Sequence, residues 1–306
     1  MKQTEESIEK SAGTSIGPLT IQNTSLQHER AVSVCIVLPT YNEAANITHI
    51  LDRIFDQQTV HGSSHIQLSV LVVDDNSPDG TADLAREYGR KNEAVHLLSR
   101  EEKDGLGAAY IAGFQHAIHT LHPDILMEMD ADGQHNPSDI FRLVTRIGAD
   151  ADFVIGSRYI PGGSVPQTWS AHRKLISRAA NRYTKMLLNT GGAKDCTGGF
   201  RAIKASTLLK IDFAQLQVKG YAFQVTLLDA CVRNGAMIQE VPIAFLERER
   251  GESKMRPKDM ILGALMIANI RIHRLLHGHN HKDTRSTHMT RTRATHKSSA
   301  KLSANS

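Results

Sequence analysis

The stretch Ile125-Leu126-Met127-Glu128-Met129-Asp130-Ala131-Asp132-Gly133-Gln134 decides the predicted fold. Its apolar part has the length of one strand and ends in two carboxylates one residue apart. Ligands of open α/β sheets bind at the carboxyl ends of strands, so Asp130 and Asp132 should project into a cleft. Two carboxylates with the Gln134 side chain nearby suit Mg²⁺ or Mn²⁺, with substrate phosphates filling the other positions. Taken alone, Asp-x-Asp is more often a solvated turn than a metal site. The rest of the chain must therefore decide between these two interpretations.

Apolar runs alternate with helical patterns on both sides of this stretch. The other predicted strands cover residues 32–38, 68–73, 94–98, 153–155 and 237–246, and the glycine-rich turn at 195–201 leads into a further short strand. The predicted helices cover residues 44–57, 81–90, 105–119, 172–188 and 220–233, and a further one begins at Pro137. This alternation predicts a mostly parallel α/β sheet with helices on both faces. Pro242 in the last run predicts an edge strand or a bulge, because proline cannot donate a ladder hydrogen bond.

Composition divides the chain into four parts. Residues 1–30 are polar and predict a disordered arm without the apolar core of a secretory signal. Residues 31–258 predict a single α/β domain. Residues 259–276 predict an amphipathic helix, too short to span a bilayer but long enough to lie on its surface. Residues 277–306 are basic and rich in His, Ser and Thr, and predict a flexible, disordered tail.

The net charge of +4 belongs to the tail and not to the predicted domain. Residues 271–306 contain eight Lys and Arg against one Asp, so they carry +7 and leave 4 − 7 = −3 for the remainder. Nucleic-acid binding is disfavoured, because neither aromatic interleaving nor a recognisable module accompanies these charges. The three cysteines are an odd number without metal-site spacing, which argues against a disulfide framework and fits a reducing compartment.

Polar side chains follow four of the predicted strands. These are the residues at 41–43, Asp74 with Asp75, Asp130 with Asp132, and Arg158. Each set alone could cap a helix or form a solvated turn. Because parallel strands place their carboxyl ends at one edge, acids on one side and arginine on another would suit a metal-bound anionic ligand.

Familiar nucleotide motifs are absent from the sequence. Gly105 and Gly107 begin a G-x-G-x-x-G pattern, but its third position is Tyr110 and the pattern follows the third strand. There is no P-loop and no G-x-S-x-G elbow. These failures disfavour a nicotinamide-dependent oxidoreductase.

Two basic segments could bind phosphate or could be ordinary solvated faces. Arg173 and Ser177 are four residues apart on one face of the predicted helix, and with Arg158 they could clasp a phosphate. The charged segment 248–254 contains Gly251 and could close over a pyrophosphate leaving group.

Eight motifs in order across residues 32–258 resemble the dolichol-phosphate mannosyltransferase (polyprenol monophosphomannose synthase) family, family-2 glycosyltransferases with a GT-A, Rossmann-like fold. They are Pro-Thr-Tyr-Asn-Glu (39–43), Asp-Asp-Asn-Ser-Pro-Asp-Gly-Thr (74–81), Gly-Leu-Gly-Ala-Ala-Tyr (105–110), Met-Asp-Ala-Asp-Gly-Gln-His-Asn-Pro (129–137), Gly-Ser-Arg-Tyr (156–159), Arg-Lys-Leu-Ile-Ser-Arg-Ala-Ala-Asn (173–181), Thr-Gly-Gly-Phe-Arg (197–201) and Arg-x-x-Gly-x-Ser-Lys (248–254). The resemblance implies an inverting enzyme that moves mannose from GDP-mannose to dolichyl or polyprenyl phosphate.

The resemblance also assigns roles to residues by position. The guanosine pocket would include Pro39, Tyr41, Glu43, Val73 and Asp75. The metal and the sugar nucleotide would be held by Asp130, Ala131, Asp132 and Gln134, and the lipid phosphate by Arg158, Arg173 and Ser177. Arg248 and Lys254 would close over the diphosphate, which makes Asp130, Asp132 and Arg248 the expected catalytic residues.

A lipid acceptor implies peripheral attachment at the cytoplasmic face of a membrane, the endoplasmic reticulum in a eukaryote or the cell membrane in a prokaryote. The helix at 259–276 and the basic tail are the expected contacts with anionic lipid, although the helix could equally be a core-packing element. A small membrane-embedded partner subunit is compatible with this arrangement. Two alternatives stay open: a related enzyme using UDP-glucose or another sugar nucleotide, and a catalytically silent binding subunit.

Overall fold

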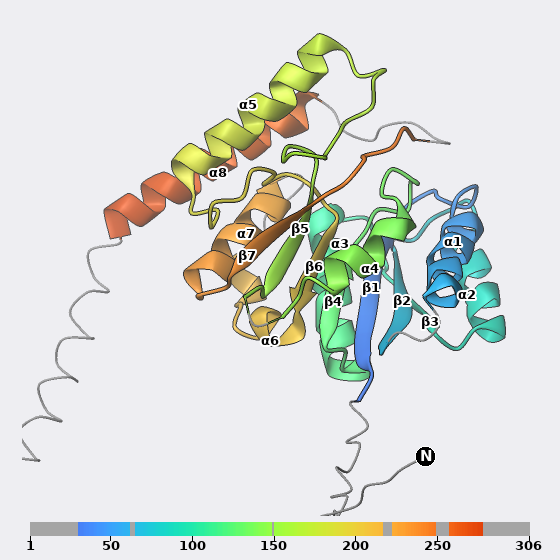
Figure 1. Ribbon diagram of the computed structural model, residues 1–306. Coiled ribbons are helices and arrows are strands. Elements are labelled where there is room, and N and C mark those ends of the chain that lie inside the picture. Colours follow the sequence, from blue (N-terminus) through green and yellow to red (C-terminus); the bar gives the residue numbers. More distant parts are fainter. Residues whose placement is uncertain (1–29, 62–64, 149, 217–221, 249–256, 278–306) are drawn as a thin grey trace, which may run out of the picture. The chain divides into compact units, whose positions relative to one another are not determined.

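The computed structural model describes residues 30–61, 65–148, 150–216, 222–248 and 257–277 (Figure 1). These residues contain a seven-stranded sheet in the order β3-β2-β1-β4-β6-β5-β7. Its strands are β1 (Val32–Thr40), β2 (Ile66–Asp74), β3 (Val95–Ser99), β4 (Ile125–Glu128), β5 (Phe153–Ser157), β6 (Arg201–Lys204) and β7 (Ile238–Pro242). The predicted disordered segments at the two ends fall outside the described residues, apart from Arg30 and His277 at their margins.

Helices cover both faces of the sheet, as the sequence predicts. The helices of the described residues are α1 (Ile47–Val60), α2 (Thr81–Lys91), α3 (Leu106–His116), α4 (Ile140–Val144), α5 (Ala171–Leu187), α6 (Ala205–Leu208), α7 (Ala222–Arg233) and α8 (Pro257–His277), with short helical turns at Ala117–Leu121, Pro137–Asp139 and Phe213–Leu216. Along β1, Val34 and Ile36 join the core under α1 and α4, while Cys35 and Val37 join the core under α3 and α7. Alternate residues therefore serve two cores, as expected for a strand that is buried on both faces.

The sheet is mostly parallel, with one reversed strand. β1 pairs in parallel with β2 and β4, β2 with β3, and β5 with β7. β6 lies antiparallel between β4 and β5, so β5 runs in the same direction as β4. The carboxyl ends of β1, β2, β4 and β5 therefore share one edge. Pro242 ends β7 at the border of the sheet, which confirms the predicted edge strand.

Two predicted helix boundaries are wrong, for local reasons. The first helix begins at Ile47 and not at 44, because Asn42 adopts a φ of 55° and the Glu43 amide donates to Thr81 Oγ1. The helix predicted over 105–119 ends as an α-helix at His116, and a π-helical turn follows it.

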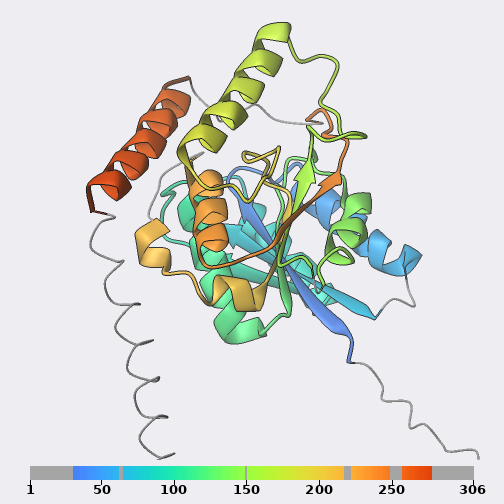
Figure 2. The same ribbon diagram turned by 60° about the vertical axis from the view of Figure 1, so that its left-hand side comes forward.

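Helices α5 and α8 lie side by side over α7 and form a separate small layer (Figures 1 and 2). Tyr183 on α5 donates its hydroxyl hydrogen to the Ala264 carbonyl of α8, at 2.8 Å. Ile267 of α8 packs with Leu188 and Val225 in a small core. Of the helices within the described ranges, none combines the length and the apolar character that crossing a bilayer requires.

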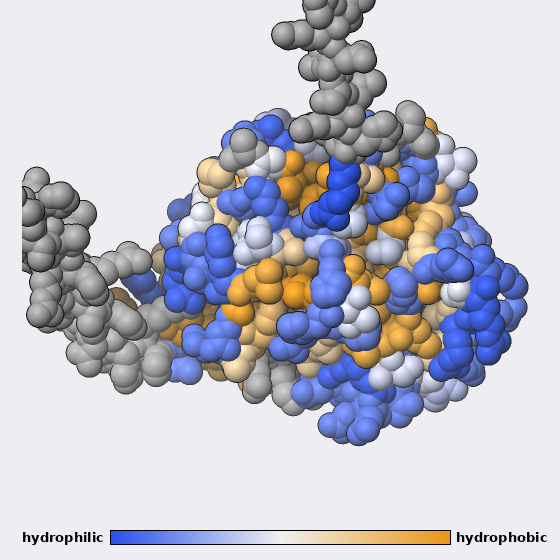
Figure 3. All heavy atoms as spheres, turned by 90° about the horizontal axis from the view of Figure 1, so that it is seen from below, coloured by the Kyte–Doolittle hydropathy of each residue, from blue (hydrophilic) through white to orange (hydrophobic). Residues whose placement is uncertain are grey.

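The amino edge of the parallel strands lies on the opposite side of the sheet from the carboxyl edge. Figure 3 views this side from below and shows hydrophobic areas bordered by hydrophilic ones. α6 follows the end of β6, where Lys204 pairs with Ile125 at the start of β4, and so belongs to this side. The carboxyl edge carries the predicted site.

Candidate active site

One pocket at the carboxyl edge brings the predicted acidic and basic residues together. It has a volume of about 720 Å³, and its polar end is lined by Asp130, Asp132, Gln134, Arg158, Arg173, Ser177 and Arg248. These residues come from the loop after β4, the end of β5, the first turns of α5 and the segment after β7. The structure thus brings Asp130, Asp132 and Arg158 of the predicted strand ends to one pocket, whereas residues 41–43, Asp74 and Asp75 do not line it.

The loop after β4 presents the two carboxylates. β4 ends at Glu128, and Met129 makes a long final hydrogen bond to the Val37 carbonyl, at 3.4 Å. Gly133 has a φ of 79°, a conformation that glycine adopts without steric cost, and this turn folds the chain back on itself. The Gln134 amide then donates to Asp132 Oδ1 at 3.0 Å. The turn thus fixes the spacing of the acidic pair.

The environment disfavours the charged form of both carboxylates. Although the Asp130 side chain is 34% exposed, burial raises its pKa to about 6, and the charge of Arg248 offsets this only in part. Burial also raises the pKa of Asp132, and the neighbouring charge of Asp130 raises it further. A cation placed between the two carboxylates would relieve both effects.

Arg248 already supplies such a positive charge. Its Nη2 atom lies 2.6 Å from Asp132 Oδ2. The segment that carries it is fixed to the acidic loop, because the Leu246 amide donates to the Gln134 carbonyl at 2.9 Å. In return, Gln134 Nε2 donates to the Leu246 carbonyl at 3.1 Å. Lys254, the second predicted contact for the diphosphate, lies outside the described residues.

The donor set fits a divalent cation that shares its coordination with a substrate. Asp130 and Asp132 offer carboxylate oxygens, and Gln134 can offer its amide oxygen because its nitrogen is bound to Leu246. Across the described part of the chain, no group of three or more His, Cys, Asp or Glu side chains gathers as a complete protein cage. Mg²⁺ and Mn²⁺ suit such a site, since they accept a few carboxylates together with phosphate oxygens.

Arg158 is held by a buried carboxylate that the sequence prediction missed. Its Nε and Nη2 atoms each lie 2.7 Å from an oxygen of Asp195, and Nη2 also donates to Thr197 Oγ1 at 2.9 Å. Burial alone would raise the pKa of Asp195, but the hydrogen bonds and charge of Arg158 hold it below its usual value. Arg158 is therefore a preorganised cation in the pocket wall.

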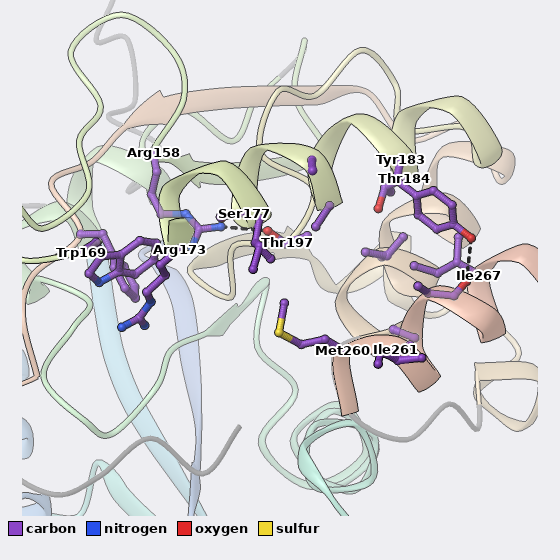
Figure 4. Close-up of a pocket in the computed structure, with 18 of the residues that line it drawn as sticks. Arg158, Trp169, Arg173, Ser177, Tyr183, Thr184, Thr197, Met260, Ile261 and Ile267 are labelled. Carbon is purple, nitrogen blue, oxygen red and sulfur yellow. Dashed lines mark hydrogen bonds between the residues drawn. The ribbon is translucent and has the colours of Figure 1, made fainter. Parts of the chain in front are cut away.

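Arg173 and Ser177 line the same wall from α5 (Figure 4). The Arg173 guanidinium lies 3.9 Å from the centre of the Trp169 ring, a cation–π contact. Ser170 caps the helix by accepting the Arg173 amide at 3.2 Å. Ser177 Oγ accepts a hydrogen bond from the Tyr159 hydroxyl at 2.6 Å. The first turns of α5 thus offer a cation, a hydroxyl and the positive end of a helix dipole to an anion.

Beyond Arg173, the pocket becomes apolar and runs between α5 and α8. Its lining there includes Ile176, Ala180, Tyr183, Val225, Met260, Ile261 and Ile267. Figure 4 shows Met260, Ile261 and Ile267 on α8 facing the α5 side chains across this space. One continuous pocket therefore joins an acidic end, a cationic wall and an apolar channel.

The residues predicted to contact a nucleoside follow β1 and β2 at the same edge. The Lys103 ammonium lies 3.8 Å from the centre of the Tyr41 ring, and Arg100 Nη1 lies 2.5 Å from Asp75 Oδ1. Burial raises the pKa of Asp75, against the effect of Arg100. Glu43 is buried, and Pro39 is half-buried in β1. Ala131 is buried within the acidic loop.

Val73 does not present its side chain to the pocket. It is 0% exposed and belongs to the core beneath α3. A ligand at the strand edge could therefore meet only its backbone. By contrast, Arg100 follows β3 at this edge, so the strand-end pattern used for the other residues could also have identified it.

Comparison with known proteins decides the family. The model of glycosyl transferase family 2 matches residues 35–211. The chain belongs to this family. This family-2 glycosyltransferase is 42% identical over 248 residues to the polyprenol monophosphomannose synthase of Mycolicibacterium smegmatis, covering 81% of this chain and 87% of that protein. It is 45% identical over 222 residues to the undecaprenyl-phosphate mannosyltransferase of Micrococcus luteus, covering 72% of this chain and 87% of that protein.

Solved structures share the fold of this family-2 glycosyltransferase. Mannosyl-3-phosphoglycerate synthase from Rubrobacter xylanophilus aligns with a TM-score of 0.58 at 19% identity, over 82% of this chain and 77% of that one. Glucosyl-3-phosphoglycerate synthase from Mycobacterium tuberculosis, in complex with Mn²⁺ and UDP-glucose, aligns with a TM-score of 0.55 at 22% identity, over 78% of each chain. The mostly parallel sheet with flanking helices is therefore a GT-A-like fold, as predicted.

Proposed function

We propose that this enzyme transfers mannose from GDP-mannose to a polyprenyl phosphate. The observation that carries the proposal is the continuous pocket, in which Asp130 and Asp132 lie at one end and an apolar channel between α5 and α8 lies at the other. Arg158 and Arg173 line the pocket between these ends. A phosphorylated lipid has the matching arrangement, because its anionic head would meet the arginines while its chain fills the channel. The names of the two curated relatives agree with this choice of acceptor.

The acceptor needs little help from a general base. A phosphate monoester has a second pKa of about 6 and is largely dianionic at neutral pH. Arg158, fixed by Asp195, and Arg173, stacked on Trp169, would hold this dianion and reduce its repulsion from the donor diphosphate. The protein's main task is thus to align two anions.

The transfer itself is a single displacement. An oxygen of the acceptor phosphate forms a bond to C1 of mannose, and the bond from C1 to the diphosphate breaks with its electron pair leaving on GDP. Attack from the opposite side inverts the α linkage to β. A divalent cation bound by Asp130, Asp132 and Gln134 would supply positive charge to the departing diphosphate. Arg248, next to Asp132, is placed to stabilise the same developing charge.

The proposal includes attachment to a membrane surface at the cytoplasmic side. α8 leaves several large apolar side chains exposed, among them Ile261, Leu262, Leu265, Ile272 and Leu275. On α5, Leu175 and Met186 are likewise exposed. These side chains lie on the two helices that form the apolar channel. Contact of these helices with lipid would therefore place the channel where a polyprenyl chain can enter it. A membrane-embedded partner subunit could use the same surface.

The decisive experiment measures the transfer of radiolabelled sugar to a chloroform-soluble product. Purified protein receives polyprenyl phosphate, Mg²⁺ or Mn²⁺, and either GDP-mannose or UDP-glucose. We expect label from GDP-mannose alone, and we expect EDTA to abolish it. Label from UDP-glucose alone would overturn the donor, and no label from either in the presence of membrane lipid would favour a silent subunit.

Substitution of the acidic pair tests the site. Asp130→Ala and Asp132→Ala should each raise the barrier by more than ~2.7 kcal/mol, about a hundredfold in rate. Asp150→Ala removes an exposed aspartate outside the pocket and serves as the control. Near-normal transfer by both pocket variants would contradict the assignment.

A further inference from the structure

The backbone amide of Asp130 is bound by a side chain and not by the sheet. The ladder of β4 ends at Glu128, and the last bond beyond it, from Met129 to the Val37 carbonyl, is 3.4 Å long. The Asp130 amide instead donates to Nδ1 of His135, at 3.0 Å. Because an inward-facing amide needs a partner, the imidazole continues the ladder by one residue at the point where the acidic pair begins.

His135 is itself fixed in place. Its side chain is 2% exposed and stacks on Phe200, with ring centres 5.0 Å apart at 13°. Phe245 packs edge-on against the other side, at 5.5 Å and 63°. Phe200 immediately precedes β6, and Phe245 lines the pocket three residues before Arg248, so the ring is held between the sheet and the pocket wall. The imidazole therefore cannot turn away without repacking its surroundings.

The direction of the hydrogen bond defines the chemistry of the ring. A backbone amide always donates, so Nδ1 must accept and is unprotonated. The proton of the neutral ring then lies on Nε2, which is 3.9 Å from Asp130 Oδ2. A further contact of this carboxylate, from the Tyr110 hydroxyl to Oδ1, is 3.4 Å long and too weak to orient it alone.

We propose that His135 is a positioning residue that orients Asp130 for the divalent cation through the bond from the Asp130 amide to Nδ1. The proposal rests on the proposed function, because it assumes the metal at Asp130 and Asp132. A shift of the backbone at Asp130 would move its carboxylate away from Asp132 and spoil a geometry that Mg²⁺ and Mn²⁺ require. Losing a partner that orients a metal ligand typically weakens metal binding by about 10–100-fold.

Three substitutions of His135 distinguish the role of its hydrogen-bond acceptor, Nδ1, from the packing of the imidazole ring. In His135→Asn, Oδ1 can take the position of Nδ1 and accept the Asp130 amide. His135→Leu has nearly the same shape as asparagine but has no acceptor. His135→Gln is polar, but its amide lies one bond further out, near the position of Nε2. Asparagine should therefore retain the function, whereas leucine and glutamine should lose it.

The test measures the binding of Mn²⁺ to the full chain in the presence of GDP. The electron paramagnetic resonance signal of free Mn²⁺ reports how much Mn²⁺ remains unbound. We expect the leucine and glutamine variants to bind Mn²⁺ at least about tenfold more weakly, and the asparagine variant to stay within about threefold of the original. In transfer assays the Mn²⁺ concentration for half-maximal rate should rise in parallel, while KM for the lipid acceptor should not change. Circular dichroism and Tm establish that each variant is folded.

Each outcome has a distinct meaning. Unchanged Mn²⁺ binding in the leucine and glutamine variants would overturn the proposal. Equal loss in asparagine and leucine would also overturn it, because ring packing and not the acceptor would then matter. If the leucine variant does not fold, the comparison of asparagine with glutamine decides. If the unmodified protein binds no Mn²⁺, or Asp132→Asn binds it normally, the metal assignment of the proposed function fails, and this proposal fails with it.

Discussion

The guanidinium of Arg248 lies 2.6 Å from the carboxylate of Asp132, one of the two acidic residues expected to bind a cation. Arginine and a divalent cation would therefore use the same carboxylate. In the proposed reaction, the diphosphate of the donor would give Arg248 a second anionic partner. The ion pair would thus couple binding of a cation at the acidic end to the position of Arg248, which we propose acts in the transfer.

This coupling predicts effects of opposite sign for Arg248→Gln. Without the guanidinium, Mn²⁺ no longer competes with Arg248 for Asp132. Binding of Mn²⁺ in the absence of nucleotide should therefore become tighter by about tenfold or more, because one hydrogen bond to a charged group is worth about 1.5–3 kcal/mol. The rate of mannose transfer should nevertheless fall by about a hundredfold, because the leaving diphosphate loses its cation. Calorimetric titration with Mn²⁺ and the transfer assay measure the two effects. Weaker Mn²⁺ binding in the variant would show that Arg248 supports the cation site and does not compete with it.

Arg173 should affect the acceptor and not the donor. Arg173→Ala removes a cation held on the Trp169 ring at the first turn of α5, so KM for polyprenyl phosphate should rise about tenfold with KM for GDP-mannose unchanged. Arg178→Ala is the matched control, since Arg178 is exposed on the same helix and does not line the pocket. Equal effects of the two substitutions would indicate a general loss of helix charge and would contradict a specific phosphate contact.

Asp195 should make folding stability depend on pH at the acid end. Its pKa is lower in the folded protein than the usual 3.8, because the bonds from Arg158 outweigh the effect of burial. The unfolded chain therefore takes up the proton first, so this contribution is present above pH 3.8 and is lost as pH falls through the lower folded value. Asp195→Asn should cost about 3–5 kcal/mol at neutral pH, since it leaves Arg158 without its buried partner.

Urea unfolding of the original protein and of Asp195→Asn between pH 5 and 2.5 measures how the free energy of unfolding depends on the charge of Asp195. The difference between them should shrink toward the acid end, whereas Asp150→Asn, at an exposed aspartate, should follow the original protein. A constant difference between Asp195→Asn and the original protein would show that Asp195 stabilises the fold independently of its charge.

The exposed face of α8 should control binding to lipid vesicles. Leu265→Glu places a charge at a leucine that is 62% exposed beside the apolar channel, and it should reduce sedimentation with anionic vesicles by several-fold. Leu209→Glu changes a leucine of equal exposure, 65%, at the end of α6 on the opposite edge of the sheet. Identical sedimentation of the two variants would exclude α8 as the lipid contact.

Much of this architecture could be predicted from the sequence, because buried strands of a parallel sheet appear as continuous apolar runs. The glycine-rich turn at 195–201 also predicts the short strand β6, but not its direction, and the first residue of β6, Arg201, is 0% exposed. A buried arginine is tolerated there because Glu128 on β4 lies 3.6 Å from it, and this partner is a neighbour only after the sheet has formed. No pattern within residues 201–204 indicates that the strand runs antiparallel.

The candidate site likewise contains residues that could be predicted from the sequence and residues that could not. Asp130, Asp132 and Arg158 follow strands, so their convergence could be predicted from strand order alone. The residues that hold them, Asp195 for Arg158 and His135 for Asp130, could not be predicted, because their roles depend on the path of loops. Val73 shows the converse limit, since a residue in a matching motif can still turn its side chain into the core.

The antiparallel strand β6 lies between the strands that lead to the two ends of the pocket. Asp130, Asp132 and Gln134 follow β4 and, with Arg248, form the acidic end of the pocket, whereas α5, α7 and α8 build its apolar end. These two parts of the pocket meet across β6 and through the bonds between Gln134 and Leu246. Substitutions in α5 and α8 are therefore expected to change the proposed lipid acceptor with little effect on the acidic end. A chimaera that exchanges α5 and α8 between related enzymes should change its lipid while keeping its sugar.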